Sequence, residues 1–572
     1  MKRNIIKLIV LMALIISFSA CEKNLDLFPT DQISESTFFK EANDFKLFAN
    51  QFYGNLPSHS TWYTEAMSDL TAGPSGNTVS NGSYQPSEYS DTWNNNYDLI
   101  RNTTLLLTKL EESDGSLKNS SAVYGAEAHF FRAFAYFNLL QAYGGVPLIT
   151  NILNTDDEEL YAPRSTRIEI ADQIIADLDM AIASLPVQSA LSSADNGRVT
   201  KGAALAFKSR VALFEGTWQK FHSGSDANGY LQKAIDASKE VINSQQYELW
   251  DKSDQLGNQN LRHLFILDKN ITNIAGLTKS ANKEYILVNR FDKDLRGHYS
   301  MPPGNGELSP TRTFADMFLC TDGLPIDKSP LFKGKSKVTD EYQNRDSRMV
   351  TLLMIPLERY WSTAQAPWQR DWTRPNDPST GFINNVEFGL RTVTGYTSVK
   401  FLSEVQGPLG HDWPVIRYAE VLLNYAEAVY EKNGSISDED LDFSINKVKE
   451  RAELPKLTNT FASANNLNMR EEIRRERTIE LFEEGFRYND IRRWKIAETV
   501  LPKALLGIKY KGTQFETDPL WAGLNATFDE NGYLIVESAS KRQFDPAKHY
   551  LNPLPRRELI LNKNLVQNPG WQ

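Results

Sequence analysis

Four glutamates within one segment come nearest to a catalytic pattern in this sequence. They are Glu476, Glu480, Glu483 and Glu484. Hydrolysis of a glycosidic bond requires two carboxylates held at a set separation in a cleft. The glutamates alternate with arginines at three- and four-residue spacing, which is typical of an ion-paired helix. These arginines are Arg474, Arg475, Arg477 and Arg487. The pattern favours a structural role, and we predict that the protein is not an enzyme.

Metal-binding residue types are present, but their spacing is not that of a known site. The seven histidines stand at positions 59, 129, 222, 263, 298, 411 and 549, with no HExxH motif or paired spacing. A histidine-ligated metal site is therefore not predicted. The acidic clusters 156–159 and 438–440 lack the alternating ligands and central glycine of a calcium loop. We expect no cofactor; a structural calcium ion is left open but not predicted.

The composition excludes further classes of protein. The chain has 572 residues and a net charge of −10, from 62 basic and 72 acidic side chains. A protein that binds nucleic acid needs a basic face, so nucleic acid is not an expected partner. With only two cysteines, Cys21 and Cys320, the chain can form neither a disulfide framework nor a cysteine-based zinc site.

The amino terminus has the features of an export signal. Lys2, Arg3 and Lys7 precede the apolar run 8–16, and small residues lead to Cys21. The run is too short to span a bilayer, so residues 1–20 are predicted to be a signal peptide. The ending Ser-Ala-Cys resembles a bacterial lipobox, which makes Cys21 the predicted site of lipid attachment; the alternative is an ordinary signal peptide with a chance cysteine. Cys320 is then predicted to be a single, buried apolar residue.

Apolar residues at helical spacing recur in pairs of segments, and this pattern predicts the fold class. The pairs are 126–143 with 167–185, 201–216 with 230–243, 415–432 with 438–452, and 469–484 with 487–498. Small residues mark close-packed seams within them. We predict a mainly α protein with a tetratricopeptide-like scaffold of about four helix pairs.

Loop-rich regions interrupt this scaffold. We expect helices mainly in 34–249 and 413–498, and loops with short strands in 250–412 and 500–572, such as 284–288 and 533–537. The Gly-, Ser- and Asn-rich stretch 68–92 is also predicted to be a loop. Residues 21–572 are expected to form a single unit whose long insertions carry the function, because scaffolds commonly place binding residues on loops.

Several motifs together resemble the SusD/RagB family over essentially the whole mature chain. They are 132–137 with 143–148, 309–311, 322–323, 344–348, 417–428, 471–494, 551–555 and 567–570. The resemblance implies a lipid-anchored protein on the cell surface of the Bacteroidetes outer membrane. It further implies that the protein binds a glycan, delivers it to a SusC-like TonB-dependent transporter, and does not hydrolyse it. In the family the helical side faces the transporter.

Under this resemblance, aromatic residues in loops become candidate ligand contacts. Sugar rings stack on flat aromatic side chains and are oriented by a few polar groups. Trp361, Trp368 and Trp372 fall within a single stretch of twelve residues inside the variable insertion. The alternative is that they pack the insertion's own small core. Trp93 and Asn96 stand where family members place a stacking tryptophan and an asparagine, with Asp69 and Tyr299 as companions. Trp93 could equally be a packing residue.

Two other functions remain open at this stage. A RagB-type member would capture peptides and should have a broader, more polar site than a glycan binder. A lipid-anchored hydrolase would release reducing ends from a polysaccharide. The tryptophan cluster at 361–372 favours the glycan.

Overall fold

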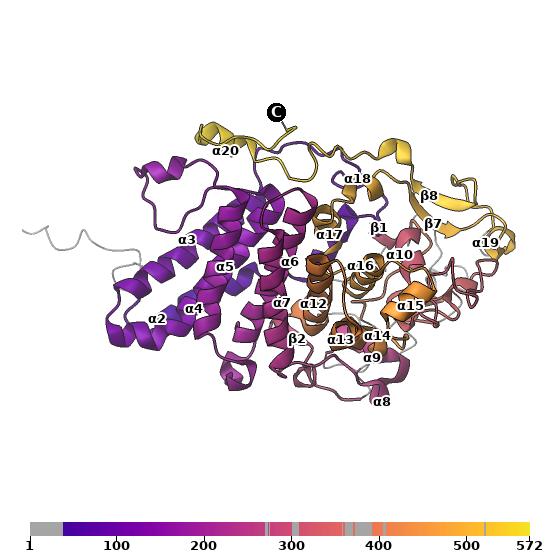
Figure 1. Ribbon diagram of the computed structural model, residues 1–572, viewed down its shortest axis with the longest axis horizontal. Helices are drawn as coiled ribbons and strands as arrows, with labels where there is room; N and C mark the ends of the chain where they lie inside the picture. Colours follow the sequence, from indigo (N-terminus) through magenta and orange to yellow (C-terminus); the bar gives the residue numbers. More distant parts are fainter. Residues whose placement is uncertain are drawn as a thin grey trace, which may run out of the picture.

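A row of long helices forms the first half of the protein (Figure 1). The computed structural model describes residues 38–268, 273, 275–299, 308–356, 359–360, 370–371, 392–403, 408–519 and 522–571. The row consists of α2 (Ala42–Asn50), α3 (Asp91–Glu112), α4 (Gly115–Tyr143), α5 (Arg167–Ser184), α6 (Lys201–Phe221) and α7 (Ala227–Asn243). It continues through α12 (Tyr418–Asn433), which packs on α7, to α16 (Met469–Glu480). The predicted scaffold of helix pairs is confirmed.

The sequence of α4 shows why these helices pack closely. Phe130, Phe134 and Phe137 recur at helical spacing and are buried against Phe207 of α6. Small alanines between them let the backbones approach, and aromatic burial supplies most of the apolar area. The helix ends at Gly144, whose φ of 75° is readily adopted only by glycine.

The second half of the row is more broken than its periodicity predicts. Residues 415–417 belong to strand β6 (Trp413–Arg417), so the helix starts three residues later than expected. The predicted helix 438–452 is two helices, α13 (Asp438–Phe443) and α14 (Ile445–Arg451), divided at Ser444. The segment 487–498 also divides, into α17 (Arg487–Arg493) and α18 (Ala497–Val500). Tertiary packing overrides the local helical pattern at these positions.

Short helices and two-stranded sheets fill the rest of the described chain. The helices are η2 (His59–Met67), α8 (Ser253–Leu256), α9 (Asn260–Ile266), α10 (Arg312–Met317), α11 (Ser347–Leu352), α15 (Asn459–Ala464), α19 (Gln514–Thr517) and α20 (Arg556–Leu561). The antiparallel pairs are β1 (Thr71–Ala72) with β3 (Ser309–Pro310), β2 (Tyr285–Asn289) with β6, β4 (Arg359–Tyr360) with β5 (Arg370–Asp371), and β7 (Leu505–Lys509) with β8 (Tyr533–Glu537). The strands expected near 284–288 and at 533–537 are confirmed.

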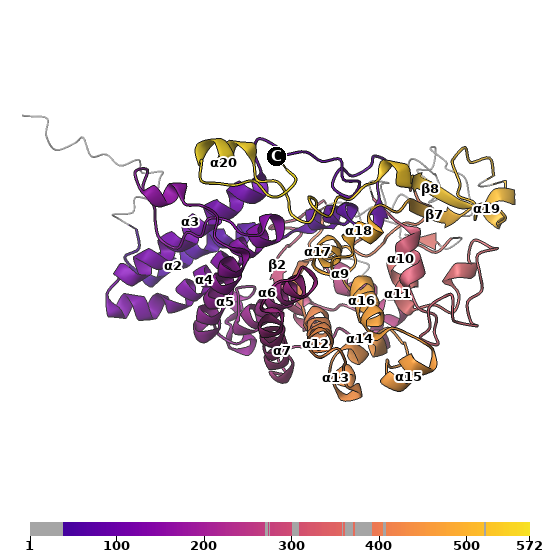
Figure 2. The same cartoon turned by 45° about the horizontal axis from the view of Figure 1, so that its top comes forward.

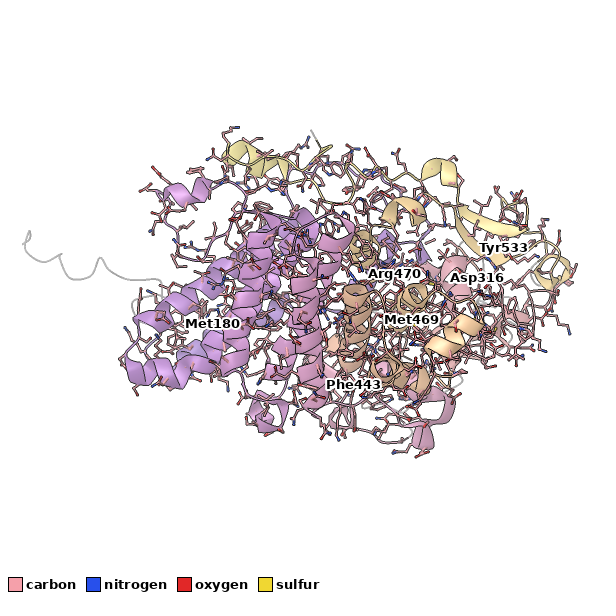
Figure 3. All side chains as sticks on the ribbon, in the orientation of Figure 1. Met180, Asp316, Phe443, Met469, Arg470 and Tyr533 are labelled. Carbon is pink, nitrogen blue, oxygen red and sulfur yellow. The ribbon has the colours of Figure 1, made fainter. Side chains whose placement is uncertain are left out.

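The β7–β8 ribbon lies at the end of the molecule away from α2 (Figure 2). Tyr533 of β8 and Asp316 of α10 are neighbours there (Figure 3). Arg312 joins them, because its guanidinium lies 3.7 Å from the centre of the Tyr533 ring and 2.7 Å from an Asp316 carboxylate oxygen. A cation stacked on an aromatic ring in this way fixes the ribbon to α10.

The carboxyl-terminal segment returns across the first helices, where Figure 1 shows α20 above α3 and α5. The Asn552 amide donates to the carbonyl of Ala142 at 2.8 Å, and the Asn568 side chain donates to that of Tyr143 at 3.1 Å. These bonds satisfy carbonyls at the end of α4, which the helix leaves without partners. Two motifs that lie about 400 residues apart in the sequence therefore meet at one turn.

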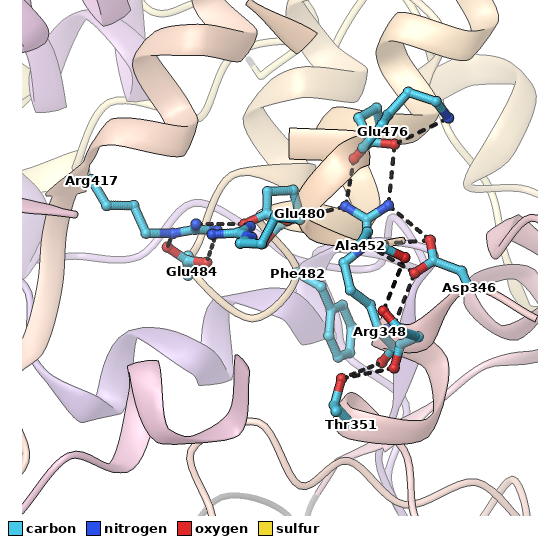
Figure 4. Close-up of polar contacts among 12 residues, drawn as sticks. Asp346, Arg348, Thr351, Arg417, Ala452, Glu476, Glu480, Phe482 and Glu484 are labelled. Carbon is cyan, nitrogen blue, oxygen red and sulfur yellow. Dashed lines mark hydrogen bonds and ion pairs between the residues drawn. The ribbon is translucent and has the colours of Figure 1, made fainter. Parts of the chain in front are cut away.

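A buried ion-pair network fixes the insertion to the scaffold (Figure 4). Arg417 contacts Glu484, Glu480 and Glu284 at 2.8, 2.6 and 2.8 Å. Arg348 extends the network to Glu476. The segment 471–494, which divides into α16 and α17, is therefore ion-paired, as predicted, but the predicted partners are wrong for Glu476, Glu480 and Glu484. Their cations come mainly from other elements, because these carboxylates face the core.

Candidate functional site

A polar cavity lies between the loop after β1 and the β7–β8 ribbon. Its volume is about 430 Å³, and we call it the loop cavity. Asn77, Asn81 and Ser75 line it from the loop, and Glu537 and Lys541 line it from the end of β8. Amides, hydroxyls and charged groups thus converge on a space large enough for a few small rings, which is how pockets orient polar ligands.

The fold of the loop depends on short polar turns and glycines. Asn77 Oδ1 accepts from the backbone amides of Val79 and Ser80 at 2.9 and 3.1 Å, which closes an Asx turn. At Gly76 a Cβ atom would lie 2.7 Å from a Glu537 carboxylate oxygen. A side chain there would displace the Glu537 carboxylate from its present position, so this glycine leaves room for that carboxylate in the cavity wall.

Glu537 is the best-held charged group of the cavity wall. Its carboxylate accepts from Asn81 Nδ2 at 3.2 Å and pairs with Arg542 at 2.5 Å. Arg542 also donates to the carbonyl of Leu501, so the pair is tied to the scaffold. Lys541 is exposed beside it. The cavity therefore combines a fixed carboxylate with an exposed cation that a ligand can engage.

The candidate tryptophans of the insertion, Trp361, Trp368 and Trp372, lie outside the described residues. The chain that follows their segment is described from Thr392, whose hydroxyl donates to that of Ser309 at 3.1 Å. Ser309 pairs with Ala72 in the β1–β3 sheet, and Ala72 lines the loop cavity. Thr392 therefore lies close to the wall of the loop cavity.

Trp93 and Asn96 are buried at the start of α3. The Trp93 side chain is 6% exposed and packs against Tyr97 and Tyr143. Asn96 donates to the carbonyl of Thr92 and accepts from Asn138 at 3.0 Å. Both residues serve packing in this structure, which is the alternative left open for Trp93. A sugar could stack on the indole only after it became exposed, so a ligand role remains a prediction.

Asp69 and Tyr299 lie in different surroundings. Burial alone would raise the pKa of Asp69, but its two bonds to Arg487, at 2.8 and 2.9 Å, hold that pKa below its ordinary value. The carboxylate is thereby committed to an internal ion pair. Tyr299 is 75% exposed, next to the bridge between His298 and Leu409. Of the four predicted contacts Trp93, Asn96, Asp69 and Tyr299, Tyr299 alone is exposed to solvent.

Among the described residues, one set of side chains could hold a metal ion. His59, His298 and His411 are buried, with ligand nitrogens within 4.8 Å of one another. These histidines are far apart in the sequence, so their spacing could not reveal that they meet. The prediction from spacing, that there is no histidine-ligated metal site, therefore missed this cluster. Cys320 is unpaired and buried, as predicted. None of the described helices has the length and apolar character needed to cross a membrane.

Known proteins resemble this chain over most of its length. A SusD-like protein of Formosa agariphila is 23% identical over 522 residues, covering 86% of this chain and 90% of its own. A SusD-like protein of Bacteroides ovatus is 22% identical and covers 85% and 82%. A crystal structure titled as a SusD-like carbohydrate binding protein of Bacteroides fragilis matches with a TM-score of 0.72 at 24% identity, covering 93% of this chain and all of that one.

Two family profiles also match. One, described as starch-binding associating with outer membrane, matches residues 49–213. The other, described as the SusD family, matches residues 275–571, which is more than half of the chain. The helical scaffold, the matched motifs and this profile agree, and the protein belongs to the SusD family.

Proposed function

We propose that this protein is a lipid-anchored glycan-binding protein of the cell surface. It captures oligo- or polysaccharide and delivers it to a SusC-like TonB-dependent transporter in the outer membrane. The loop cavity is the observation that carries the proposal, because it presents amide, hydroxyl, carboxylate and ammonium groups to one space. A relative of similar fold is titled a carbohydrate binding protein, and one matching profile is described as starch-binding, which supports the same ligand class.

The chemistry of the cavity suits a sugar better than an ion or an apolar molecule. Sugar hydroxyls both donate and accept hydrogen bonds, so they pair with Asn77 and Asn81 as well as with Glu537 and Lys541. An aromatic platform would complete such a site, and Trp361, Trp368 and Trp372 are our candidates for it. Glu476, Glu480 and Glu484 are buried and held in ion pairs, so these three carboxylates are not available to act as those of a glycosidase.

Removing the exposed cation of the cavity, Lys541, should weaken glycan binding. We expect Lys541→Ala to raise the dissociation constant roughly three- to tenfold, the contribution of about one ordinary hydrogen bond, and Trp361→Ala to raise it roughly tenfold or more. A panel of polysaccharides screened in affinity gels, followed by calorimetry on the best ligand, measures both changes.

The matched control is Lys239→Ala, which removes an exposed lysine of α7 away from the cavity. It should bind like the wild type. Unchanged affinity in both Lys541→Ala and Trp361→Ala would show that glycan binds elsewhere. Binding of peptides but of no polysaccharide would favour the RagB-type alternative.

The membrane anchor has a separate test. Cys21→Ala removes the thiol that would carry the lipid, so we expect the protein to move from the detergent-extracted membrane fraction to the soluble fraction. Cys320→Ala is the control, since this buried cysteine has no access to a lipid-transfer enzyme. Tight membrane association of the Cys21→Ala variant would contradict lipid attachment.

A further inference from the structure

Three histidines from distant parts of the chain meet in the interior. His59 begins η2, His298 pairs with Leu409 in an isolated bridge, and His411 follows two residues after that leucine. The three residues are buried, with exposed fractions of 2%, 8% and 1% for His59, His298 and His411. The rings of His59 and His298 stack at 3.6 Å, and His411 stands edge-on to both. The cluster thus joins the scaffold to the insertion.

All six ring nitrogens of this cluster lack a hydrogen-bond partner among the described residues. Buried polar side chains in folded proteins are nearly always paired, so an unpaired set calls for a missing partner such as an ion. His59 and His298 are stacked face to face and His411 stands edge-on to both, and no N–H···N bond forms among the three rings. A cation between them accepts a lone pair from each.

We propose that His59, His298 and His411 bind one divalent transition-metal ion, with Zn²⁺ as the expected occupant. Three nitrogen ligands suit zinc, copper, nickel and cobalt, whereas calcium and magnesium require oxygen ligands. Zinc–nitrogen bonds of about 2.0–2.1 Å in a tetrahedral site place the nitrogens about 3.4 Å apart. The ligand nitrogens lie within 4.8 Å of one another, and metal binding requires the stacked rings of His59 and His298 to turn toward a shared position.

The surroundings favour the neutral rings that metal binding requires. Phe291 and Trp413 pack on His59, at 4.8 and 5.4 Å between ring centres. Burial lowers the pKa of His59 to about 2 and that of His298 to about 4, and it lowers the pKa of His411 well below its ordinary value. The backbone of His411 raises the pKa of His298, which partly offsets the effect of burial. The contact between them does not have the geometry of a hydrogen bond.

Charged neighbours complete the environment of the cluster. Lys279 further lowers all three pKa values, but its ammonium is held by Asp412 at 2.6 Å and by the carbonyls of Phe291 and Gly410. Asp268 raises the pKa of His298. Asp412 and the two carbonyls thus offset part of the charge of Lys279, and the rest still acts on the three rings.

A second cavity adjoins the cluster at His411. This cavity has a volume of about 430 Å³ and is lined by His411, Lys279, Tyr285 and Phe265, among others. Three protein ligands leave a fourth position for water or for a group of a ligand. Because the ligands come from η2, from residue 298 and from residue 411, a bound ion would tie the insertion to the scaffold and stabilise the folded state.

The test uses the mature chain without a polyhistidine tag, dialysed against a chelator. We expect calorimetry to show about one Zn²⁺ per chain, a higher melting temperature with zinc, and visible absorption typical of tetrahedral nitrogen ligation with Co²⁺. His298→Gln, at the most exposed of the three positions, should weaken zinc binding at least tenfold. His129→Gln is the control, since His129 bonds to Asp177 away from the cluster.

Anomalous diffraction at the zinc edge on wild-type crystals tests the site without any variant. A peak between the three imidazoles supports the proposal. Zinc binding well below one ion per chain, equal affinity in His298→Gln and wild type, or an anomalous peak elsewhere would overturn it.

Discussion

Replacing Arg417 with alanine is expected to lower the free energy of unfolding by about 3–5 kcal/mol, the usual cost of removing one partner of a buried ion pair. The guanidinium bonds Glu484 through two nitrogens, and it also bonds Glu480 and Glu284. Without it each of these carboxylates loses one of its buried cationic partners. Urea unfolding followed by circular dichroism measures the change.

The network around Arg417 explains why the loss should be large. Glu480 also pairs with Arg348 and Arg451, and Glu484 also pairs with Lys400. All these side chains are at most 4% exposed, so water cannot solvate a charge that loses its partner. The contacts link β6, α11, α14 and α16, which hold the insertion on the scaffold.

Lys456→Ala provides the control for this prediction. Lys456 pairs with Asp442 at 3.0 Å, but the two side chains are 56% and 48% exposed. Exposed pairs contribute little, so the variant should change the free energy of unfolding by less than about 1 kcal/mol. If Arg417→Ala were equally mild, the buried network would not hold the two parts together as described.

The second large effect is a loss of stability in acid that depends on Glu427. Burial alone would raise the pKa of this carboxyl, but Arg493, Arg477 and the Trp494 indole lower it to about 2. The folded-state pKa thus lies below the unfolded value of about 4.5, so the ionised form stabilises the fold above pH 4.5. This lowering of the Glu427 pKa corresponds to about 3 kcal/mol of stability, which is lost as the pH falls from about 5 to 2.

Glu427→Gln isolates this contribution from that of other acidic groups. The variant lacks the titrating carboxylate, so it should be less stable than wild type by about 3 kcal/mol at pH 7. This difference should shrink as the pH approaches 2, where wild-type Glu427 becomes protonated. Urea unfolding of both proteins from pH 7 to pH 3 measures it. A difference that stays constant across this range would contradict the role of Glu427 ionisation.

Local patterns in the sequence predicted the long helices and the short strands well. The aromatic stripe of α4 and its glycine stop define that helix, because one apolar face and one terminator suffice. Local patterns failed at Val415, which periodicity assigned to a helix and which lies in β6. There the pairing with β2, more than 100 residues earlier, decides the conformation.

The candidate site was less predictable, because its contacts join distant segments. The sequence predicts a loop at 68–92, but it does not show that the other wall of the loop cavity comes from β8, some 460 residues later. Asp69 looked available in the sequence, whereas the fold pairs it with Arg487. The histidine cluster unites positions 59, 298 and 411, and no single-sequence spacing encodes such a meeting.

The most direct test of the central claim, that this protein binds glycan without cleaving it, combines two readings on one sample. The purified mature chain is incubated with the polysaccharide that it retards most in affinity gels, and binding and newly formed reducing ends are measured together. We predict saturable binding with reducing ends no higher than in the polysaccharide alone. Release of reducing ends in proportion to protein concentration, or the absence of binding to every polysaccharide in the panel, would contradict the account.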